Sequence, residues 1–334
     1  MRPSHQHNNT ARATTLPGIR IGHATDPRGL TGCTVILAEH GAACGVDIRG
    51  SATATRDLGP CTPGHVVEQV QAIFLTGGSA FGLDAAAGVM QFLESKGVGF
   101  PTGAARVPIV PAAAIYDLGI GSTKARPDAK MALMACRNAS NRISEGSVGA
   151  GTGATVGKLF GMKHATRGGV GFWQIMIAGK VTAQVLVVVN SFGDVVDPSS
   201  GRIIAGTRMG APYVGFANTV QEMIRGKVRK GFGATNTTLA VVMTDAALSK
   251  IQAAKVAQMA QNGICRATVP AHTLFDGDVV FALSVGKKRA DVNALGAAAA
   301  EATAQAIVGA VMAAESLGGV PACEDLLRRP SALK

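Results

Sequence analysis

Short apolar runs rich in valine and leucine alternate along the chain with longer stretches rich in alanine. The short runs are typical of buried strands and lie at residues 33–38, 72–76, 185–190, 239–244 and 279–285. The longer stretches predict helices at residues 82–95, 128–138, 246–262 and 292–316. Strands and helices therefore alternate through the whole sequence, which predicts an α/β fold.

The two ends of this pattern set the limits of the predicted domain. Residues 1–17 are polar and predict a tail, in which His5 and His7 are given no role. Residues 18–334 predict one domain, because large mixed sheets reach this length without dividing. The first ten residues contain no apolar stretch of the kind that a secretory signal needs, so we expect no such signal.

The longest apolar segment, residues 294–314, is rich in alanine. Glu301 and Gln305 interrupt it, so we expect a buried helix rather than a membrane span, and no membrane partner. Hydrophobic residues make up 47% of the chain but aromatic residues only 4%, and there are 43 glycines. This composition predicts a core of small aliphatic side chains in which sheets and helices pack closely.

The chain has a formal net charge of +11, which raises the question of nucleic-acid binding. The clearest basic cluster lies in a predicted linker and consists of Arg225, Lys227, Arg229 and Lys230. Only 2 tyrosines and 1 tryptophan are present to stack on bases. A solvated surface and a linker therefore explain the charge, and we expect no nucleic-acid partner.

Six cysteines are scattered at positions 33, 44, 61, 136, 265 and 323. They form no Cys-x-x-Cys pair and have no histidine at the spacing of a zinc site, so we expect no metal and no cofactor. Scattered thiols of this kind are typical of reduced cysteines in a cytosolic protein, and the expected location is the cytoplasm.

The junction between Asn236 and Thr237 is a candidate site of chemistry, because a threonine here opens an apolar run after a Gly/Asn turn. Attack of its hydroxyl on the preceding carbonyl would cut the chain and free the α-amine of Thr237. Such an amine has a pKa of about 7.7–8.0 and can act as general base for the hydroxyl of the same residue. The alternative is an ordinary turn entering a strand.

Asp276 and Asp278 lie two residues apart downstream, so in an extended segment they point to the same face. Two carboxylates on one face repel unless a cation lies beside them, and an N-terminal ammonium is one such cation. The alternatives are a solvated turn or a calcium loop. Val280 stands where an EF-hand would place its next ligand, which excludes that motif.

Glycine-rich segments at residues 77–82 and 149–157 suggest a nucleophile elbow and a phosphate loop, but each segment lacks a residue that its motif requires. Gly78-Ser79-Ala80-Phe81 lacks the second glycine of a nucleophile elbow. Gly157-Lys158 is followed by leucine where a phosphate loop needs serine or threonine. We expect these glycines to allow close approach of the backbone around a site.

Taken in order, several segments resemble the P1 family of peptidases, which includes the L-aminopeptidase/D-amidase/D-esterases, the β-peptidyl aminopeptidases and the nylon-oligomer hydrolases. The resemblance runs from Gly18 to about Leu317. It rests on Leu-Thr-Gly-Gly-Ser-Ala-Phe-Gly-Leu (75–83), Val-Pro-Ile-Val-Pro-Ala-Ala-Ala-Ile-Tyr-Asp-Leu (107–118), Gly-Ala-Gly-Thr-Gly-Ala-Thr-Val-Gly-Lys (149–158), Val-Val-Val-Asn-Ser-Phe-Gly-Asp-Val-Val-Asp-Pro (187–198), Asn-Thr-Thr-Leu (236–239) and Phe-Asp-Gly-Asp (275–278).

This resemblance implies a role for individual residues. Thr237 resembles the nucleophile, and Asn236 the residue whose carbonyl is cleaved. Asn190 resembles the amide that helps to form the oxyanion hole, and Asp276 and Asp278 stand where the family places its orienting pair. Lys158 and Tyr116 resemble the polar pair of the pocket. Lys158 is either a charge partner for the aspartates or a donor to the reaction centre, and Tyr116 is equally explained as a buried aromatic residue.

The resemblance also implies a four-layer α-β-β-α sandwich of the aminopeptidase/ornithine acetyltransferase type. Self-cleavage would give an α chain, 1–236, and a β chain, 237–334, and relatives assemble such pairs into tetramers or larger rings. The expected substrate is a short peptide, amide or ester with a free amino end. Nylon-type or β-peptide oligomers are an alternative, favoured by the threonine with two aspartates. Acyl transfer, or a relative that never matures, are further alternatives.

Overall fold

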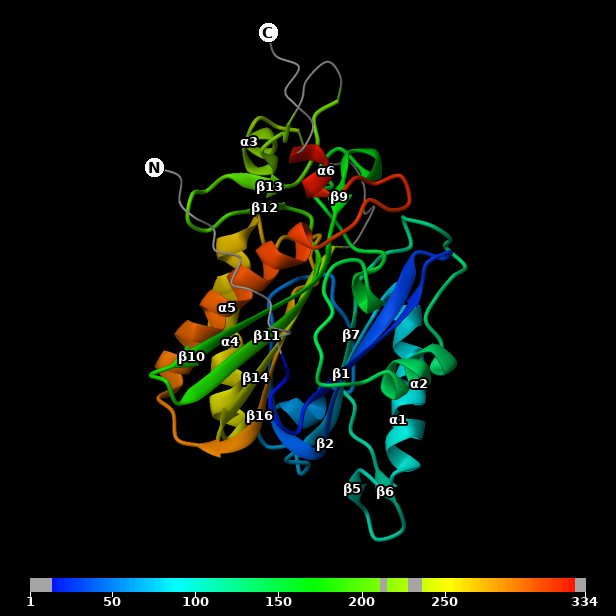
Figure 1. Ribbon diagram of the computed structural model, residues 1–334, viewed down its shortest axis with the longest axis vertical. Coiled ribbons are helices and arrows are strands. Elements are labelled where there is room, and N and C mark those ends of the chain that lie inside the picture. Colours follow the sequence, from blue (N-terminus) through cyan, green and yellow to red (C-terminus); the bar gives the residue numbers. More distant parts are fainter. Residues whose placement is uncertain (1–13, 211–214, 228–235, 328–334) are drawn as a thin grey trace.

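The computed structural model describes residues 14–210, 215–227 and 236–327 (Figure 1). Nine of its strands form one sheet that is folded over at strand β2, Thr31–Ile48. The first part of β2 pairs with one half of the sheet and the second part with the other half, and the register shifts between Leu37 and Ala42. A single strand of 18 residues therefore belongs to two packed layers.

One half of the sheet carries the candidate nucleophile. Its order is β10 (Gly169–Ile177), β11 (Val181–Asn190), β14 (Thr237–Ala246), β16 (Val279–Lys288) and the second part of β2. All of these neighbours are antiparallel except β14 and β16, which are parallel. The apolar runs of β11 and β14 are buried on both faces, which is why they lack an alternating pattern.

The other half of the sheet contains β1 (Arg20–Asp26), the first part of β2, β4 (Val70–Thr76), β7 (Ala112–Ala114) and β3 (Ala54–Arg56). Helices α1 (Ala86–Glu94) and α2 (Ala129–Arg137) cover its outer face, as Figure 1 shows. Helices α4 (Lys250–Ala267) and α5 (Val292–Met312) cover the outer face of the first half.

Three apolar clusters separate these layers. One lies between the two halves of the sheet and joins side chains such as Ile73 of β4 to Val241 of β14. The other two lie between each half and its pair of helices. The order helix, sheet, sheet, helix confirms the four-layer α-β-β-α sandwich that the resemblance implied, with small aliphatic side chains filling most of its core.

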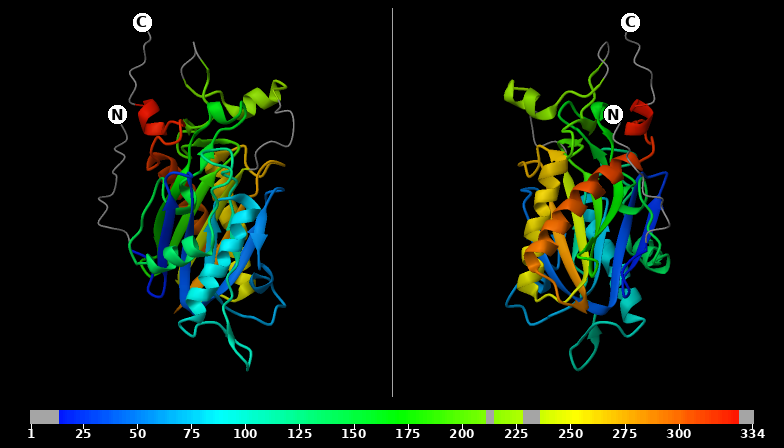
Figure 2. Two further views of the ribbon diagram at one scale, coloured as in Figure 1. Left: turned by 90° about the vertical axis from the view of Figure 1, so that its right-hand side faces the viewer. Right: turned by 60° about the vertical axis from the view of Figure 1, so that its left-hand side comes forward.

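Smaller elements lie at one end of the sandwich and in its loops (Figure 2). The three-stranded sheet consists of β12 (Asp194–Val196), β13 (Ile203–Ala205) and β15 (Thr268–Val269). The remaining elements are the pairs β5 (Phe100–Pro101) with β6 (Arg106–Val107) and β8 (Thr155–Val156) with β9 (Thr166–Arg167), the short helices α3 (Thr219–Ile224) and α6 (Cys323–Leu327), and 3₁₀ turns at Gly59–Cys61, Ser79–Ala85, Gly149–Gly151 and Met162–His164.

The predicted strands and helices are all present, with shifted ends. The helix expected from residue 246 begins at Lys250, because Ser249 caps it with a side-chain bond to the Gln252 N–H. At the end of the predicted tail, Thr14 bridges Arg142 and Leu16 is buried. Residues 1–13, with His5 and His7, lie outside the described residues.

Helix α5 is the one described helix that is long and apolar enough to cross a membrane by length and composition alone. It packs on α4 and on the sheet, and 61% of its most apolar window is buried. In the basic cluster, Arg225 and Lys227 both pair with Glu222 at 2.8 and 2.5 Å, whereas Arg229 and Lys230 lie outside the described residues.

Candidate active site

Thr237 is the first residue of β14, and its partner across the ladder is Asn190, the last residue of β11. Neighbouring antiparallel residues lie about 5 Å apart between Cα atoms, so strand register alone brings these two together. Thr237 is 2% exposed and Asn190 is fully buried. The site is therefore built at the end of two core strands, which hold it rigidly.

The carbonyl oxygen of Asn236 is the centre of the site. The Thr237 hydroxyl donates a hydrogen bond to it at 2.6 Å. The backbone N–H of Gly277 donates to the same oxygen, also at 2.6 Å. Asn236 itself is anchored by its own N–H, which donates to the Phe275 carbonyl at 2.8 Å. The peptide bond between Asn236 and Thr237 thus lies fixed between the hydroxyl and a backbone donor.

Gly277 has no room for a side chain. A Cβ atom here would lie 2.6 Å from the Ala52 carbonyl oxygen and 2.9 Å from the Thr237 hydroxyl oxygen. Ala52 also donates its N–H to the Asp276 carbonyl at 2.9 Å. The Asp-Gly-Asp segment is therefore clamped between the chain that follows β2 and the start of β14, and the glycine permits this close approach.

The two aspartates brace the site from different sides. Asp278 accepts from the Thr238 N–H at 2.6 Å and from the ring and backbone N–H groups of His272 at 2.8 and 3.1 Å. Asp276 accepts from the Phe192 N–H at 3.1 Å and from the Thr273 N–H and hydroxyl at 3.1 and 2.6 Å.

Both aspartates are buried, with 1% of each residue exposed. Burial and the neighbouring charge of Asp278 raise the pKa of Asp276 from 3.8 to about 6, against the lowering effect of its hydrogen bonds. The acids hold the backbone on each side of the nucleophile: Asp278 through Thr238, and Asp276 through the turn that follows Asn190.

Asn190 joins this centre to the two other predicted residues. Its side-chain oxygen accepts from the Lys158 ammonium at 2.8 Å and from the Thr155 N–H at 3.1 Å. Its side-chain N–H donates to the backbone carbonyl of Tyr116 at 3.1 Å. Lys158 also donates to the Asn190 carbonyl at 3.0 Å. The amide is therefore locked in one orientation, with nitrogen toward Tyr116 and oxygen toward Lys158.

Lys158 is placed by the glycine before it. Gly157 has φ +67°, and a Cβ there would lie 1.9 Å from the Gly206 backbone, so this turn requires glycine. Tyr116 and Lys158 line one small cavity of about 10 Å³, roughly the space of one water molecule. Beside it, buried Asp117 fixes the Tyr116 loop by accepting from Gly78 N–H at 2.7 Å and the Thr31 hydroxyl at 2.6 Å.

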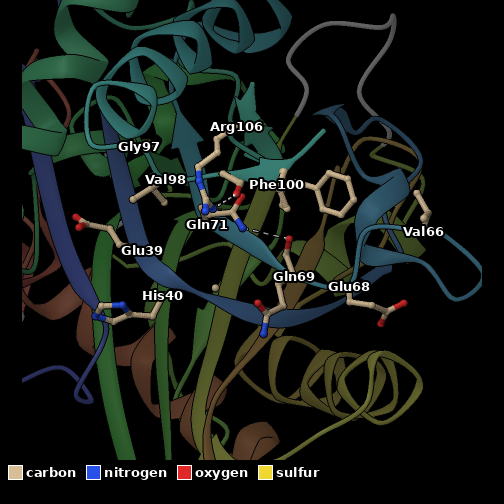
Figure 3. A pocket seen from close by; sticks show the side chains of 13 residues that line it. Glu39, His40, Val66, Glu68, Gln69, Gln71, Gly97, Val98, Phe100 and Arg106 are labelled. Carbon is tan, nitrogen blue, oxygen red and sulfur yellow. Dashed lines mark hydrogen bonds between the residues drawn. The ribbon is translucent and has the colours of Figure 1, made fainter. Parts of the chain in front are cut away.

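A pocket larger than this cavity lies elsewhere. It measures about 460 Å³ and is formed at the bend of β2 and the start of β4, with Glu39, His40, Gln71 and Arg106 among its walls (Figure 3). None of the predicted site residues is among the residues that line it. Size alone would therefore point away from the Thr237 centre.

Metal-ligating groups do not gather in the part of the chain that the structure describes: it contains no cluster of three histidine, cysteine, aspartate or glutamate residues. All six cysteines are described and unbridged, and five of them are buried.

Sequence reasoning missed three contributors to the site: the Gly277 N–H, the Thr273 hydroxyl and the His272 ring. His272 and Thr273 lie just before Asp276 in the same short segment, and this closeness in sequence could have indicated that they contact the two acids. Gly277, between the two acids, was also apparent in the sequence. Its N–H donates to the Asn236 carbonyl, however, and only the fold brings these two groups together.

A four-layer sandwich with a threonine at the start of a core strand is the architecture of the N-terminal nucleophile hydrolases. The chain belongs to peptidase family S58, whose family model matches residues 12–323. It is therefore a peptidase-family hydrolase, and the resemblance to the P1 peptidases is confirmed.

Individual relatives agree with this assignment. The chain is 37% identical over 348 residues to an uncharacterized aminopeptidase of Mycobacterium leprae, covering 92% of each. It is 30% identical over 314 residues to the 6-aminohexanoate-oligomer endohydrolase of Paenarthrobacter ureafaciens, covering 88% of this chain and 84% of that protein. The l-aminopeptidase d-Ala-esterase/amidase of Ochrobactrum anthropi, described as a variant of the Ntn hydrolase fold, has a TM-score of 0.71 at 18% identity and covers 97% of this chain and 95% of its own.

Proposed function

We propose that this chain cuts itself between Asn236 and Thr237 and then acts as an aminopeptidase through an acyl-enzyme on the Thr237 hydroxyl. The observation that carries the proposal is the Asn236 carbonyl oxygen, which accepts the Thr237 hydroxyl and the Gly277 N–H at 2.6 Å each. A carbonyl held between a nucleophile and a backbone donor is arranged for attack, because the donor stabilises the negative charge that develops on the oxygen.

Maturation proceeds in two balanced steps. The Thr237 oxygen bonds to the Asn236 carbonyl carbon, the peptide C–N bond breaks, and the hydroxyl proton passes to the departing nitrogen. Water then hydrolyses the resulting ester, which leaves a carboxylate on Asn236 and restores the Thr237 hydroxyl. The Thr237 nitrogen is now a free amine, which serves as general base in later turnovers.

Turnover repeats this chemistry on an external substrate. The Asn236 carbonyl marks the place where the substrate carbonyl binds once the chain is cut. The amine of Thr237 removes the proton of its own hydroxyl, the hydroxyl oxygen attacks, and the leaving amine takes the proton. The Gly277 N–H and the side-chain amide of Asn190 are the donors that we assign to the developing oxyanion, each worth about 2.7–4 kcal/mol.

The first candidate substrate is a short peptide, amide or ester with a free amino end, which agrees with the names of the relatives from M. leprae and O. anthropi. Hydrolysis of nylon-type or β-peptide oligomers is a second candidate. It is favoured by the 6-aminohexanoate-oligomer endohydrolase among the relatives and by a threonine flanked by two buried aspartates. Acyl transfer to an amine acceptor in place of water is a third.

The test is the covalent state of purified protein. Denatured wild type separates into fragments 1–236 and 237–334, and the shorter fragment begins Thr-Thr-Leu-Ala. Thr237→Ala stays one chain and is inactive, because both the hydroxyl and the new amine are lost. An uncut wild type with full activity rules out the mechanism. A panel of L-, D- and β-amino-acid amides, with and without an added amine acceptor, then separates the three substrate classes.

Assembly and location complete the proposal. We expect α/β pairs to associate into a homo-oligomer such as a tetramer in the cytoplasm, in keeping with six unbridged cysteines. Light scattering of active enzyme that gives only the 33.9 kDa of one chain rejects the oligomer.

A further inference from the structure

The Asp278 carboxylate is shared between two partners on opposite sides. Its Oδ1 accepts from the Thr238 N–H at 2.6 Å, next to the nucleophile. Its Oδ2 accepts twice from His272, from the backbone N–H at 3.1 Å and from the ring Nδ1 at 2.8 Å. Because a carboxylate only accepts, Nδ1 carries the proton, and the ring is oriented by this bond.

A buried carboxylate needs a compensating cation, because burial penalises its charge. The side chain of Asp278 is only 2% exposed, and that of His272 is 18% exposed. The imidazolium of His272 supplies the positive charge at 2.8 Å. Asp276 differs, because its hydrogen-bond partners are the neutral donors of Phe192 and Thr273. The ion pair therefore distinguishes one acid from the other.

The backbone of His272 is adapted to this contact. Its φ of +57° lies in the left-handed region, which few residues other than glycine adopt. This conformation directs the backbone N–H and the ring Nδ1 of one residue to the same oxygen of Asp278. Strained conformations of this kind persist where surrounding contacts impose them, and they cluster at functional sites.

We propose that His272 is a positioning residue for Thr237: it fixes the Asp278 carboxylate, which in turn holds the start of β14. This inference rests on the proposed role of Thr237 as nucleophile. The chain of contacts runs from the ring through the carboxylate to the Thr238 N–H, one residue from the reacting hydroxyl. His272 reaches the nucleophile through Asp278 and Thr238, and it acts by keeping the nucleophile in place.

Charge is part of this role. Burial lowers the pKa of His272, but the hydrogen bond and charge of Asp278, together with the neighbouring Cys265 of α4, outweigh burial and raise that pKa from 6.5 to about 9. Asp278 and Cys265 are the titratable groups that act on the ring, and the charge of Asp278 acts on Asp276 as well. The ring is therefore a cation at neutral pH and loses its charge in the alkaline range.

Two substitutions separate the charge from the hydrogen bond. His272→Asn places an amide N–H close to the position of Nδ1, and asparagine tolerates a left-handed φ, so only the charge is lost. His272→Ala removes both. Leu274→Ala is the matched control, because Leu274 lies in the same loop and is 76% exposed. The readouts are the rate of self-cleavage by intact mass, and kcat and KM on an amino-acid amide between pH 6 and 10.

We expect His272→Ala to slow cleavage and lower kcat about tenfold or more with little change in KM, as loss of a charge-assisted hydrogen bond implies. Wild-type activity should fall as pH rises through about 9, and this fall should be absent in His272→Asn. Leu274→Ala should match wild type. Wild-type rates in His272→Ala, or an unchanged alkaline fall in His272→Asn, overturn the proposal. If His272→Ala shows no cooperative melting transition, the pH profile of His272→Asn decides.

Thr237→Ala, measured in parallel, distinguishes failure of the positioning role of His272 from failure of the proposed role of Thr237 as nucleophile. Self-cleavage or turnover by Thr237→Ala means that the nucleophile is wrongly assigned. A dead Thr237→Ala together with unaffected His272 variants refutes the positioning role alone.

Discussion

Gly277 donates its backbone N–H to the carbonyl oxygen of Asn236 at 2.6 Å, and that oxygen is also the acceptor of the Thr237 hydroxyl. The residue between the two aspartates thus contacts the peptide bond that we expect to be cut. The aspartates themselves hold neighbouring backbone groups. The proposed oxyanion donor for self-cleavage is therefore a main-chain group, whose geometry is fixed by the strand ends.

Gly277→Ala tests this contact. The added Cβ would lie 2.6 Å from the Ala52 oxygen and 2.9 Å from the Thr237 hydroxyl oxygen, so the segment must move away from the peptide bond. We expect self-cleavage to slow by about a hundredfold, the effect of losing one oxyanion donor. A time course of intact mass measures it. Gly64→Ala, where φ is +84° and no atom lies near the new Cβ, controls for the general cost of replacing a glycine. Cleavage at the wild-type rate in Gly277→Ala would exclude this donor.

Replacing either acid by its amide separates charge from volume. Asp278→Asn leaves one oxygen to serve both Thr238 and His272, so an N–H must face a donor on one side. We expect a loss of about 3 kcal/mol in transition-state stabilisation, or about a hundredfold in cleavage and turnover. Asp276→Asn should also slow both, through the turn after Asn190. Activity within about twofold of wild type in both variants would show that the acids do not orient the nucleophile.

The layer order was predictable from the family resemblance but not from periodicity. Hydrophobic runs indicated the strand at residues 33–38, yet β2 continues to Ile48 past the polar pair Glu39 and His40. The bend places its two parts in different layers. No local pattern encodes that change of partner, because it depends on which strands come to lie on each side.

The candidate site, too, was predictable from the sequence only in part. Asn190 and Thr237 lie at the ends of apolar runs, so strand positions alone place both at a sheet edge. The sequence suggested an N-terminal ammonium or Lys158 as a cation beside the two aspartates, and it did not indicate the His272 ring that contacts Asp278 in the uncut chain. That contact depends on a single left-handed residue, and sequence periodicity carries no signal for it.

The free energy of unfolding should fall as pH rises, because Asp276 and His272 lose protons. The folded-state pKa of Asp276, about 6, and that of His272, about 9, both exceed the unfolded values of 3.8 and 6.5. The folded state therefore binds more protons, and stability declines as pH rises. The stabilisation from Asp276 is fully present below pH 3.8 and is lost as pH rises through about 6. The stabilisation from His272 is fully present below pH 6.5 and is lost as pH rises through about 9.

Urea midpoints of the uncut Thr237→Ala chain, with and without Asp276→Asn or His272→Asn, measure these two contributions. Each second substitution should flatten the decline in its own pH window only. Midpoints that rise with pH relative to the substituted chains would contradict the assignment.

The rate of the matured enzyme should have a different pH dependence on its acidic side. The proposed base is the α-amine of Thr237, which must be neutral, so kcat should rise as pH passes its pKa; unperturbed amines titrate at about 7.7–8.0. The buried aspartates favour the ammonium and Lys158 disfavours it. A chelator should leave the rate unchanged, because every step is assigned to the hydroxyl, the amine and hydrogen-bond donors. Loss of activity on chelation, restored by a metal, would require another mechanism.

The last prediction concerns a buried lysine outside the Thr237 site. Lys250, at the start of α4, is 6% exposed, and its ammonium donates to the backbone carbonyls of Pro60, Thr62, His65 and Val67 at 3.4, 3.3, 3.0 and 2.6 Å. Three N–H groups are shared among four oxygens, so one side chain shapes the whole loop from residue 60 to residue 67.

Lys250→Met keeps the length of the side chain but leaves those carbonyls without their donor. Unsatisfied buried carbonyls and the lost charged bonds should lower the free energy of unfolding by about 2–4 kcal/mol. Urea unfolding of the uncut Thr237→Ala chain measures this loss. Glu68→Gln is the control: Glu68 lies 3.7 Å from the ammonium but its side chain is 75% exposed, so its substitution should cost less than about 1 kcal/mol. Equal losses in the two variants would mean that the exposed ion pair, rather than the ring of carbonyls, holds the lysine.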